Sequence, residues 1–323
     1  MKQWHFMSVI ALAMVLGIGV PGAGAGYQLL VTSRNSNNVL RYDGVTGQFM
    51  DEFIAAGSGG LSAPGGIAFK DGYIYVSSHN KGQASVKRYN AKTGAFVDNF
   101  TSGRADFPYA NLVFGPDDDL YVSSEDGASN VHRFDGATGA YIGDFLSEGD
   151  NRASIGLAFG IDDNLYVSNY LNRSIDLYDG TTGVFIKEFV TATDRFGLSV
   201  PLGLAFGPDD NLYASGSAGI YRFAGDTGAY IGQFVGTGSG GLGLTMNHAF
   251  GPDDNLYVCN FNGNEIIRYH GQSGGFIDIF VSGGGLDRTV DLLFIPEPSS
   301  IMLFFLGVLG IRNRNLFGRI TNR

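Results

Sequence analysis

The stretch GPDDNLYV at residues 251–258 recurs with one change each as GPDDDLYV at 115–122, GIDDNLYV at 160–167 and GPDDNLYA at 207–214. A second phrase, RYDGVTGQF at 41–49, occurs six times in related forms, and the glycine of its Thr-Gly or Ser-Gly pair falls at 47, 94, 139, 183, 228 and 274. Successive glycines are 47, 45, 44, 45 and 46 residues apart. The chain of 323 residues therefore contains six copies of one unit.

Each unit contains four short runs typical of β-strands. In the fourth unit these are LAFG (157–160), NLYVSN (164–169), SIDLYD (174–179) and GVFIKEFV (183–190). Asp, Asn and Gly between the runs favour tight hairpin turns. A single four-stranded sheet cannot bury both of its faces, but six sheets packed radially share a continuous core. The repeat therefore predicts an all-β fold, a six-bladed β-propeller with four antiparallel strands in each blade.

The two ends of the repeat region predict how the ring closes. The first unit begins with YQLLVTS (27–33), which corresponds to the second strand of the other units, so its innermost strand is missing. The matching phrase, DLLFI, stands at 291–295. We expect this C-terminal strand to pair with the N-terminal blade, which closes the ring and hides two sheet edges. The chain would then leave the ring on the face of the Asp-Asp-Asn hairpins.

Composition supports the same fold class and limits the partners. There are 50 Gly but only 9 Pro, and 13% of the residues are aromatic, as expected for short strands and turns. The formal net charge of −10 disfavours a nucleic-acid partner, which needs a basic face. The single cysteine, Cys259, cannot form an intramolecular disulfide and is interpreted as a small buried residue at a strand end.

The first 25 residues have the features of a secretory signal peptide. Lys2 precedes an apolar run from Phe6 to Val20, and Ala23 and Ala25 fit the small-residue cleavage pattern. We expect signal peptidase to remove residues 1–25. A retained membrane helix is the alternative, but the run is short for a bilayer.

The last segment, residues 296–323, resembles the PEP-CTERM sorting signal of Gram-negative bacteria. Pro296, Glu297 and Pro298 precede an apolar run from 301 to 311, and arginines including Arg312 and Arg314 follow it. The resemblance implies processing by an exosortase-type enzyme, with transient membrane anchoring through a C-terminal transmembrane helix. It also implies export, to the outer surface, the extracellular space or the periplasm. The alternative is an apolar helix docked on the propeller.

The repeats themselves resemble NHL-type repeats and related six-bladed propellers. The resemblance spans residues 27–295, with units near 27–66, 67–111, 112–156, 157–203, 204–248 and 249–295. This scaffold hosts binding modules, lactonases and lyases, so the resemblance implies a fold and not an activity.

Candidate site residues lie in the loops expected around the mouth of the central channel, which vary between units. One set of these loops ends in APGG (63–66), PYAN (108–111), ASIG (153–156), VPLG (200–203), TMNH (245–248) and RTVD (288–291). This alignment places His248 where three of the other five units have glycine. The predicted mouth residues are His79, Glu125, Asp126, Asn169, His248, Asn260 and Asp291.

These side chains are of the types that bind a divalent metal such as Ca²⁺ or Mg²⁺. The resemblance implies a Glu/Asn/Asp metal site in lactonases, and His and Glu with magnesium in streptogramin lyases. No ligand spacing here reproduces either pattern, and the two histidines are alternatively ordinary loop residues. No catalytic residue and no further cofactor is predicted.

The sequence therefore favours a non-catalytic binding module for a glycan, peptide or protein at the cell surface or in its polysaccharide matrix. A metal-dependent lactonase- or lyase-like enzyme is the second hypothesis, and a passive spacer is the third.

Overall fold

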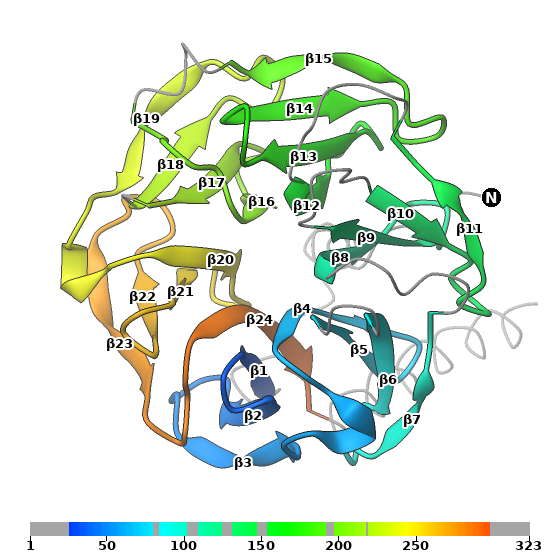
Figure 1. The fold of residues 1–323 in the computed structure, drawn as a ribbon. Helices are drawn as coiled ribbons and strands as arrows, with labels where there is room; N and C mark the ends of the chain where they lie inside the picture. Colours follow the sequence, from blue (N-terminus) through cyan, green and yellow to red (C-terminus); the bar gives the residue numbers. More distant parts are fainter. Residues whose placement is uncertain are drawn as a thin grey trace, which may run out of the picture.

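The computed structural model describes residues 26–79, 84–101, 109–124, 131–146, 154–191, 197–217 and 219–297. Within these ranges, 24 strands form six sheets of four antiparallel strands, arranged as blades around a central channel (Figure 1). The predicted six-bladed β-propeller is confirmed.

The blades follow one another in chain order. The strands of each blade are given from the innermost to the outermost: blade 1, β24 (Thr289–Pro296), β1 (Tyr27–Ser33), β2 (Asn38–Asp43), β3 (Phe49–Ile54); blade 2, β4 (Pro64–Lys70), β5 (Tyr73–Ser78), β6 (Ser85–Asn90), β7 (Phe96–Asn99); blade 3, β8 (Tyr109–Phe114), β9 (Leu120–Ser124), β10 (Val131–Phe134), β11 (Tyr141–Asp144); blade 4, β12 (Ser154–Phe159), β13 (Leu165–Asn169), β14 (Ser174–Tyr178), β15 (Phe185–Val190); blade 5, β16 (Leu204–Phe206), β17 (Leu212–Gly216), β18 (Gly219–Phe223), β19 (Tyr230–Val235); blade 6, β20 (Thr245–Phe250), β21 (Leu256–Asn260), β22 (Glu265–Tyr269), β23 (Phe276–Ser282). Two 3₁₀ turns, Ser58–Gly60 and Ser239–Gly241, precede β4 and β20.

The ring closes through pairing of the two ends of the propeller, as predicted. Strand β24 pairs antiparallel with β1, with Leu29 opposite Phe294 and Val31 opposite Leu292. In Figure 1, β24 and β1 lie side by side although they come from opposite ends of the chain. The Glu297 N–H donates to the Gly26 carbonyl at 2.9 Å, so both ends of the described propeller leave the ring at the same place.

The ring has two faces with different connections. We call the face with the turns between the first and second and between the third and fourth strands the hairpin face; in blade 4 these turns are residues 160–164 and 179–184. The opposite face, with the other connections, is the mouth face; in blade 4 it includes residues 170–173 and 197–203. Strand β24 runs from the mouth face to the hairpin face, so Pro296 and Glu297 leave on the hairpin face.

The repeated glycines of the hairpin face fit directly against the neighbouring blade. Gly183 has a φ of +70°, and a Cβ added there would lie 1.8 Å from the Phe145 carbonyl oxygen of blade 3. In all six blades the equivalent glycine has positive φ and would place a Cβ within 2.0 Å of the preceding blade's backbone. Glycine is therefore required six times, because any side chain would push two blades apart.

Aromatic side chains fill the seams between blades. Tyr166 of β13 contacts Phe189 of its own blade and Phe206 of the next, with ring centroids 4.8 and 5.0 Å apart in edge-on geometry. Blades 2, 3, 5 and 6 repeat this arrangement, whereas blade 1 has Leu30 in place of the tyrosine. Second strands such as β13 are buried on both sides because they lie inside these seams.

The described part of the chain contains no helix long and apolar enough to cross a membrane, so it gives no support to the predicted transmembrane helix. The two terminal segments, 1–25 and 298–323, for which a helix was expected at each end, lie outside the described residues. Pro298, Arg312 and Arg314 of the predicted sorting signal belong to the second of these segments.

Candidate functional site

A ring of β-bulges narrows the channel at the mouth face. In blade 2, Pro64 pairs with Ser78 and Ile67 pairs with Val76, so Gly65 and Gly66 face the single residue Ser77. The ladders of blades 1, 3, 4 and 6 are interrupted in the same way. Bulges re-aim side chains, and here they direct the bulged residues into the channel.

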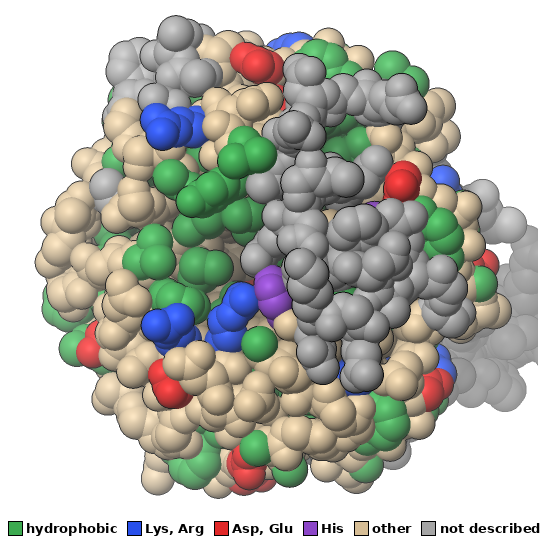
Figure 2. Space-filling view, in the orientation of Figure 1, with side chains coloured by type: hydrophobic (Ala, Val, Ile, Leu, Met, Phe, Trp, Pro, Cys, Tyr) green, Lys and Arg blue, Asp and Glu red, His purple; other side chains and the backbone are tan. Residues whose placement is uncertain are grey.

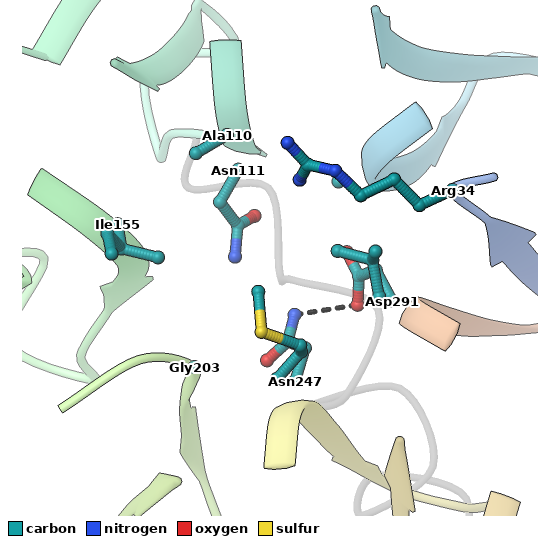
Figure 3. A pocket seen from close by; sticks show the side chains of 10 residues that line it. Arg34, Ala110, Asn111, Ile155, Gly203, Asn247 and Asp291 are labelled. Carbon is teal, nitrogen blue, oxygen red and sulfur yellow. Dashed lines mark hydrogen bonds between the residues drawn. The ribbon is translucent and has the colours of Figure 1, made fainter. Parts of the chain in front are cut away.

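These bulged residues line the cavity shown in Figure 3, which is closed in by the following side chains and backbone segments: Gly66, Ala110, Asn111, Ile155, Gly203, Met246, Asn247, Val290 and Asp291, together with Arg34 from the loop after β1. The cavity has a volume of about 20 Å³, which is room for one water-sized species. A sugar ring or a peptide cannot enter it.

Hydroxyl groups tie the bulges of adjacent blades together. Thr32, Ser77, Ser123, Ser168 and Ser215, each on the second strand of its blade, donate to a bulge carbonyl of the next blade at 2.5 to 3.1 Å. Four of these hydroxyls also accept an N–H from the bulge of their own blade. In blade 6 the equivalent residue is Cys259, which is fully buried. The cysteine thus interrupts an otherwise regular circle of hydroxyl bridges.

Asp291 connects three blades at the channel. Its Oδ1 accepts from Asn247 Nδ2 of blade 6 at 2.6 Å and from the Leu292 N–H at 2.8 Å, and its Oδ2 accepts from the Ile67 N–H of blade 2 at 3.0 Å. The side chain is only 6% exposed, and burial raises its pKa to about 6. The three hydrogen-bond donors stabilise the ionised carboxylate and so offset part of the free-energy cost of burying it.

Two asparagines occupy equivalent places in other blades. Asn247 Oδ1 accepts the His248 N–H at 3.0 Å, and Asn111 Oδ1 accepts the Leu112 N–H at 2.6 Å. Their neighbours in the ring, Gly203 and Gly66, have no room for a Cβ, which would lie 2.3 Å from Asn247 Oδ1 and 2.8 Å from the Leu112 nitrogen, respectively. Large and small residues therefore complement each other around the ring.

The oxygen donors that the structure describes in the channel are already engaged and do not suit a resident divalent metal. Asp291 already accepts three hydrogen bonds of the roughly four that a carboxylate can accept. The side-chain oxygens of Asn111 and Asn247 are also engaged with backbone N–H groups. Across the described ranges, no group of three or more His, Cys, Asp or Glu side chains is arranged to hold a metal ion.

The structure corrects the sequence alignment at His248. His248 pairs with Val258, as Ile67 pairs with Val76 and Leu157 with Val167. It therefore occupies a position of the blade wall that is aliphatic in the other blades. Asn247 occupies the position that is equivalent to Gly66 and Gly203 in other blades. The alignment was wrong by one residue in this blade.

His248 is consequently a buried wall residue. Its side chain is 3% exposed, and neither ring nitrogen reaches hydrogen-bond geometry with a described residue, although the ring lies beside the Tyr213 backbone. Burial lowers its pKa to about 4. The imidazole is therefore neutral at physiological pH.

The remaining residues that the sequence predicted for the mouth do not line the cavity where the structure describes them. Asn169 donates to Asp176 and accepts the Asn172 N–H, and Asn260 accepts the Gly243 N–H, so both amides hold loops of the mouth face. His79 is half-buried just after β5, and its N–H donates to the Ser62 carbonyl at 2.9 Å. Glu125 and Asp126 lie outside the described residues. Among the predicted residues that the structure describes, only Asp291 lines the cavity.

Sequence analysis missed Arg34, Asn111 and Asn247 as cavity-lining residues. The sequence does contain a pattern that marks the two asparagines. The innermost strand of each blade contains a phenylalanine, and the residue three positions before it is Gly66, Asn111, Gly156, Gly203, Asn247 or Asp291. Figure 3 shows Arg34 extending toward the cavity from the loop after β1. No repeat pattern marks Arg34.

A known protein-family model matches the C-terminal segment of the chain. The model of the PEP-CTERM protein-sorting motif matches residues 294–315, which confirms the sorting signal and implies export, membrane-anchored sorting and processing by exosortase-type machinery. No curated protein sequence matches the chain.

Several solved structures are similar in fold at low identity. A chain of a nidogen/laminin complex has a TM-score of 0.63 and 13% identity, covering 83% of this chain and 98% of that one. A gluconolactonase from Xanthomonas campestris has a TM-score of 0.56 and 18% identity, covering 72% and 79%. A catalytically inactive virginiamycin B lyase from Staphylococcus aureus, with quinupristin, has a TM-score of 0.58 and 15% identity, covering 84% and 92%. At these identities the similarity establishes the propeller fold alone.

Proposed function

We propose that this exported propeller is a binding module at the cell surface or in the extracellular matrix, with its glycan, peptide or protein ligand on the rim of the mouth face. One observation carries the proposal. The six units keep the same tightly packed glycine on the hairpin face but differ at the bulges and loops around the mouth, where a cavity of about 20 Å³ confines any larger ligand to the rim. Variable loops on a rigid scaffold are where recognition is usually located.

The way the chain leaves the ring supports an outward-facing mouth. Strand β24 ends at the hairpin face, and the sorting motif continues from it. In this proposal residues 1–25 form a removed signal peptide, 27–295 the propeller and 296–323 the sorting segment. The hairpin face then lies toward the membrane, and the mouth face points toward the surroundings of the cell.

The proteins of similar fold have two kinds of function, binding and enzymatic activity. The nidogen/laminin complex supports a role in protein or matrix binding, whereas the gluconolactonase and the lyase suggest enzymatic activity. The binding role is favoured because the Asp291 carboxylate and the side-chain oxygens of Asn111 and Asn247 are already hydrogen-bonded within the described propeller. A metal-dependent lactonase or lyase requires groups that are free to act on a substrate.

Blocking one face at a time tests the proposal. In a Cys259→Ser background, Asn262→Cys places a thiol on the exposed rim of the mouth, and Lys92→Cys places one on the hairpin face. Each variant is conjugated to a bulky polyethylene glycol maleimide, and its retention by the native extracellular matrix of the producing cells is measured. Loss of retention only for the Asn262→Cys conjugate is expected. Equal retention of both conjugates, or turnover of a lactone by the full chain with Mg²⁺ or Ca²⁺, would overturn the proposal.

A further inference from the structure

The arginines of this protein fall into two classes. Eight arginines lie in the described ranges. Five are on third strands, and each pairs with an aspartate: Arg41 with Asp51, Arg88 with Asp98, Arg133 with Asp117 and Asp119, Arg222 with Asp209, and Arg268 with Asp278. The other three, Arg34, Arg173 and Arg288, are in loops of the mouth face. Their guanidinium groups make no ion pair or hydrogen bond with another described residue.

Two of these unpaired arginines, Arg34 and Arg288, are neighbours across the seam that closes the ring. The Arg34 N–H donates to the Arg288 carbonyl at 3.0 Å, which continues the β1–β24 ladder one residue beyond Ser33 and Thr289. Like charges directly opposite each other on paired strands are destabilising. A protein with a formal net charge of −10 places two arginines opposite each other on paired backbone here, and neither guanidinium is paired with a described carboxylate. An external anion would remove this repulsion.

The surroundings of the pair are suited to a ligand with an apolar side. The Arg288 guanidinium lies over the Phe261 ring, 5.2 Å from its centroid, and Arg288 has a left-handed φ of +59°. Strained backbone of this kind is frequent at ligand-binding positions. Figure 2 shows basic side chains near the centre of the mouth face, next to an area of hydrophobic side chains. The exposed or half-buried residues of that face include Tyr170 and Leu171 of blade 4.

The nearby acids do not neutralise the arginines. Asp287 Oδ1 accepts from Asn35 Nδ2 at 3.1 Å, and the Asp291 oxygens accept from three N–H donors. Asp291 is also largely buried, whereas Arg288 is exposed and Arg34 half-buried. The guanidinium donors therefore remain available to a ligand. Guanidinium groups match carboxylates geometrically through paired N–H donors.

We propose that Arg34 and Arg288 form an anion subsite on the rim of the mouth, and that its ligand is an acidic glycan whose sugar carboxylates bind these arginines. This rests on the proposed binding function and names its ligand class. A glycan is favoured over an acidic peptide for two reasons. Phe261, which is half-buried beneath the Arg288 guanidinium, adds apolar surface against which a sugar ring can pack, and the inner sheet edges line a cavity too small to admit an added peptide strand.

Binding of polygalacturonate to the full chain in detergent tests the subsite. The native protein should bind this polymer more weakly as ionic strength rises, and should not bind its carboxyl-reduced, neutral form. Arg34→Ala and Arg288→Ala should each weaken binding roughly tenfold. The control variants Lys92→Ala, on the hairpin face, and Lys187→Ala, on an outermost strand, each remove the same charge as one arginine variant and should change binding less than about twofold.

Three results of the polygalacturonate assay would contradict the inference. These are no binding of polygalacturonate, equal losses in the arginine and lysine variants, or equal binding of poly-L-glutamate, which would show that charge alone is recognised. Retention of the protein by native matrix that depends on the mouth face but not on Arg34 or Arg288 would sink the subsite while leaving the proposed binding function intact.

Discussion

The two faces of the ring differ in how faithfully the chain repeats itself. On the hairpin face, six glycines meet the backbone of the preceding blade in the same way, and Asp43, Asp135 and Asp179 accept the same three hydrogen bonds in their turns. On the mouth face, the equivalent bulge positions hold Gly, Asn or Asp. The repeat is kept where every blade must fit its neighbour. The repeat is not kept on the mouth face, where the residues of different blades do not have to make the same contact.

The faces also differ in how their charges are used. The turns of the hairpin face hold most of the Asp-Asp pairs, and the arginines of the adjoining third strands are bound to aspartates. The described arginines of the mouth face are unpaired. Charge on one side stabilises the fold, and charge on the other side is available to a partner.

Removal of the closing strand has the largest expected effect on this comparison. A chain truncated after Arg288 loses β24 and exposes the edge of β1, so we expect the ring to open and the cooperative unfolding transition to disappear. Limited proteolysis and thermal unfolding measure this. Truncation after Glu297, which keeps β24, is the control and should unfold like the parent. A chain without β24 that resists protease as well as this control would contradict ring closure.

A glycine of the hairpin face should be the most sensitive single position. Gly94→Ala places a Cβ 1.8 Å from the Phe53 carbonyl oxygen at a φ of +67°, so we expect a loss of roughly 3–5 kcal/mol of unfolding free energy. Gly57 has a similar φ of +71° but nothing within 4 Å, and Gly57→Ala should cost only about 1 kcal/mol. Denaturant unfolding compares the two. Equal losses would mean that backbone conformation, and not blade contact, explains the repeated glycine.

His248 should make stability depend on pH. Its pKa is lowered to about 4 by burial, so between pH 6.5 and 4 the unfolded chain binds a proton that the folded chain does not. Stability therefore falls as pH falls through this window, by about 2 kcal/mol at pH 5 relative to pH 8. His248→Leu restores the aliphatic side chain of the other blades and should remove this loss.

The matched control for this change is His270→Leu at an exposed histidine, which tests whether the loss belongs to the buried position and not to any histidine. Asp291 contributes with the opposite sign, because its pKa is raised to about 6 and its contribution to stability falls as pH rises from about 4 to 6. That contribution is shared by parent and variants, so it cancels in the difference. A His248→Leu protein with an unchanged pH profile would refute the buried neutral imidazole.

The smallest expected effect is at Cys259. Cys259→Ser supplies the sixth hydroxyl of the circle and should stabilise the protein by about 1 kcal/mol, if its hydroxyl donates to the bulge of blade 1 as the other five do to theirs. The reverse change, Ser168→Cys, removes donation to the Leu202 carbonyl at 2.6 Å and should destabilise by a similar amount. Calorimetric midpoints of both variants check this. Destabilisation by Cys259→Ser would show that blade 6 is packed around the thiol.

The fold could be predicted from the sequence because its constraints are repeated. Six spaced glycines, six turns and a missing first strand that reappears at 291–295 are independent statements of the same ring. The predicted site was less accurate for a physical reason. A bulge places two residues opposite one, so a register taken from loop ends can slip by one residue, as it did between Asn247 and His248.

Arg34 shows a second limit. The role proposed for Arg34 in binding an anion depends on its position at the seam that closes the ring and on the absence of a described carboxylate partner. Neither property can be recognised in a local sequence pattern. Asn169 and Asn260 show the converse, since polar residues at strand ends looked available to a ligand but hold loops in place.

The relation of the two faces to the membrane is tested most directly by fluorescence quenching in liposomes containing the full chain. A fluorophore is attached at Lys92→Cys on the hairpin face or at Asn262→Cys on the mouth face, each in the Cys259→Ser background, and the lipids carry a spin label on the headgroup. Strong quenching at position 92 and weak quenching at position 262 are predicted, because the sorting segment leaves from the hairpin face. Equal quenching at both positions, or stronger quenching at position 262, would contradict an outward-facing mouth.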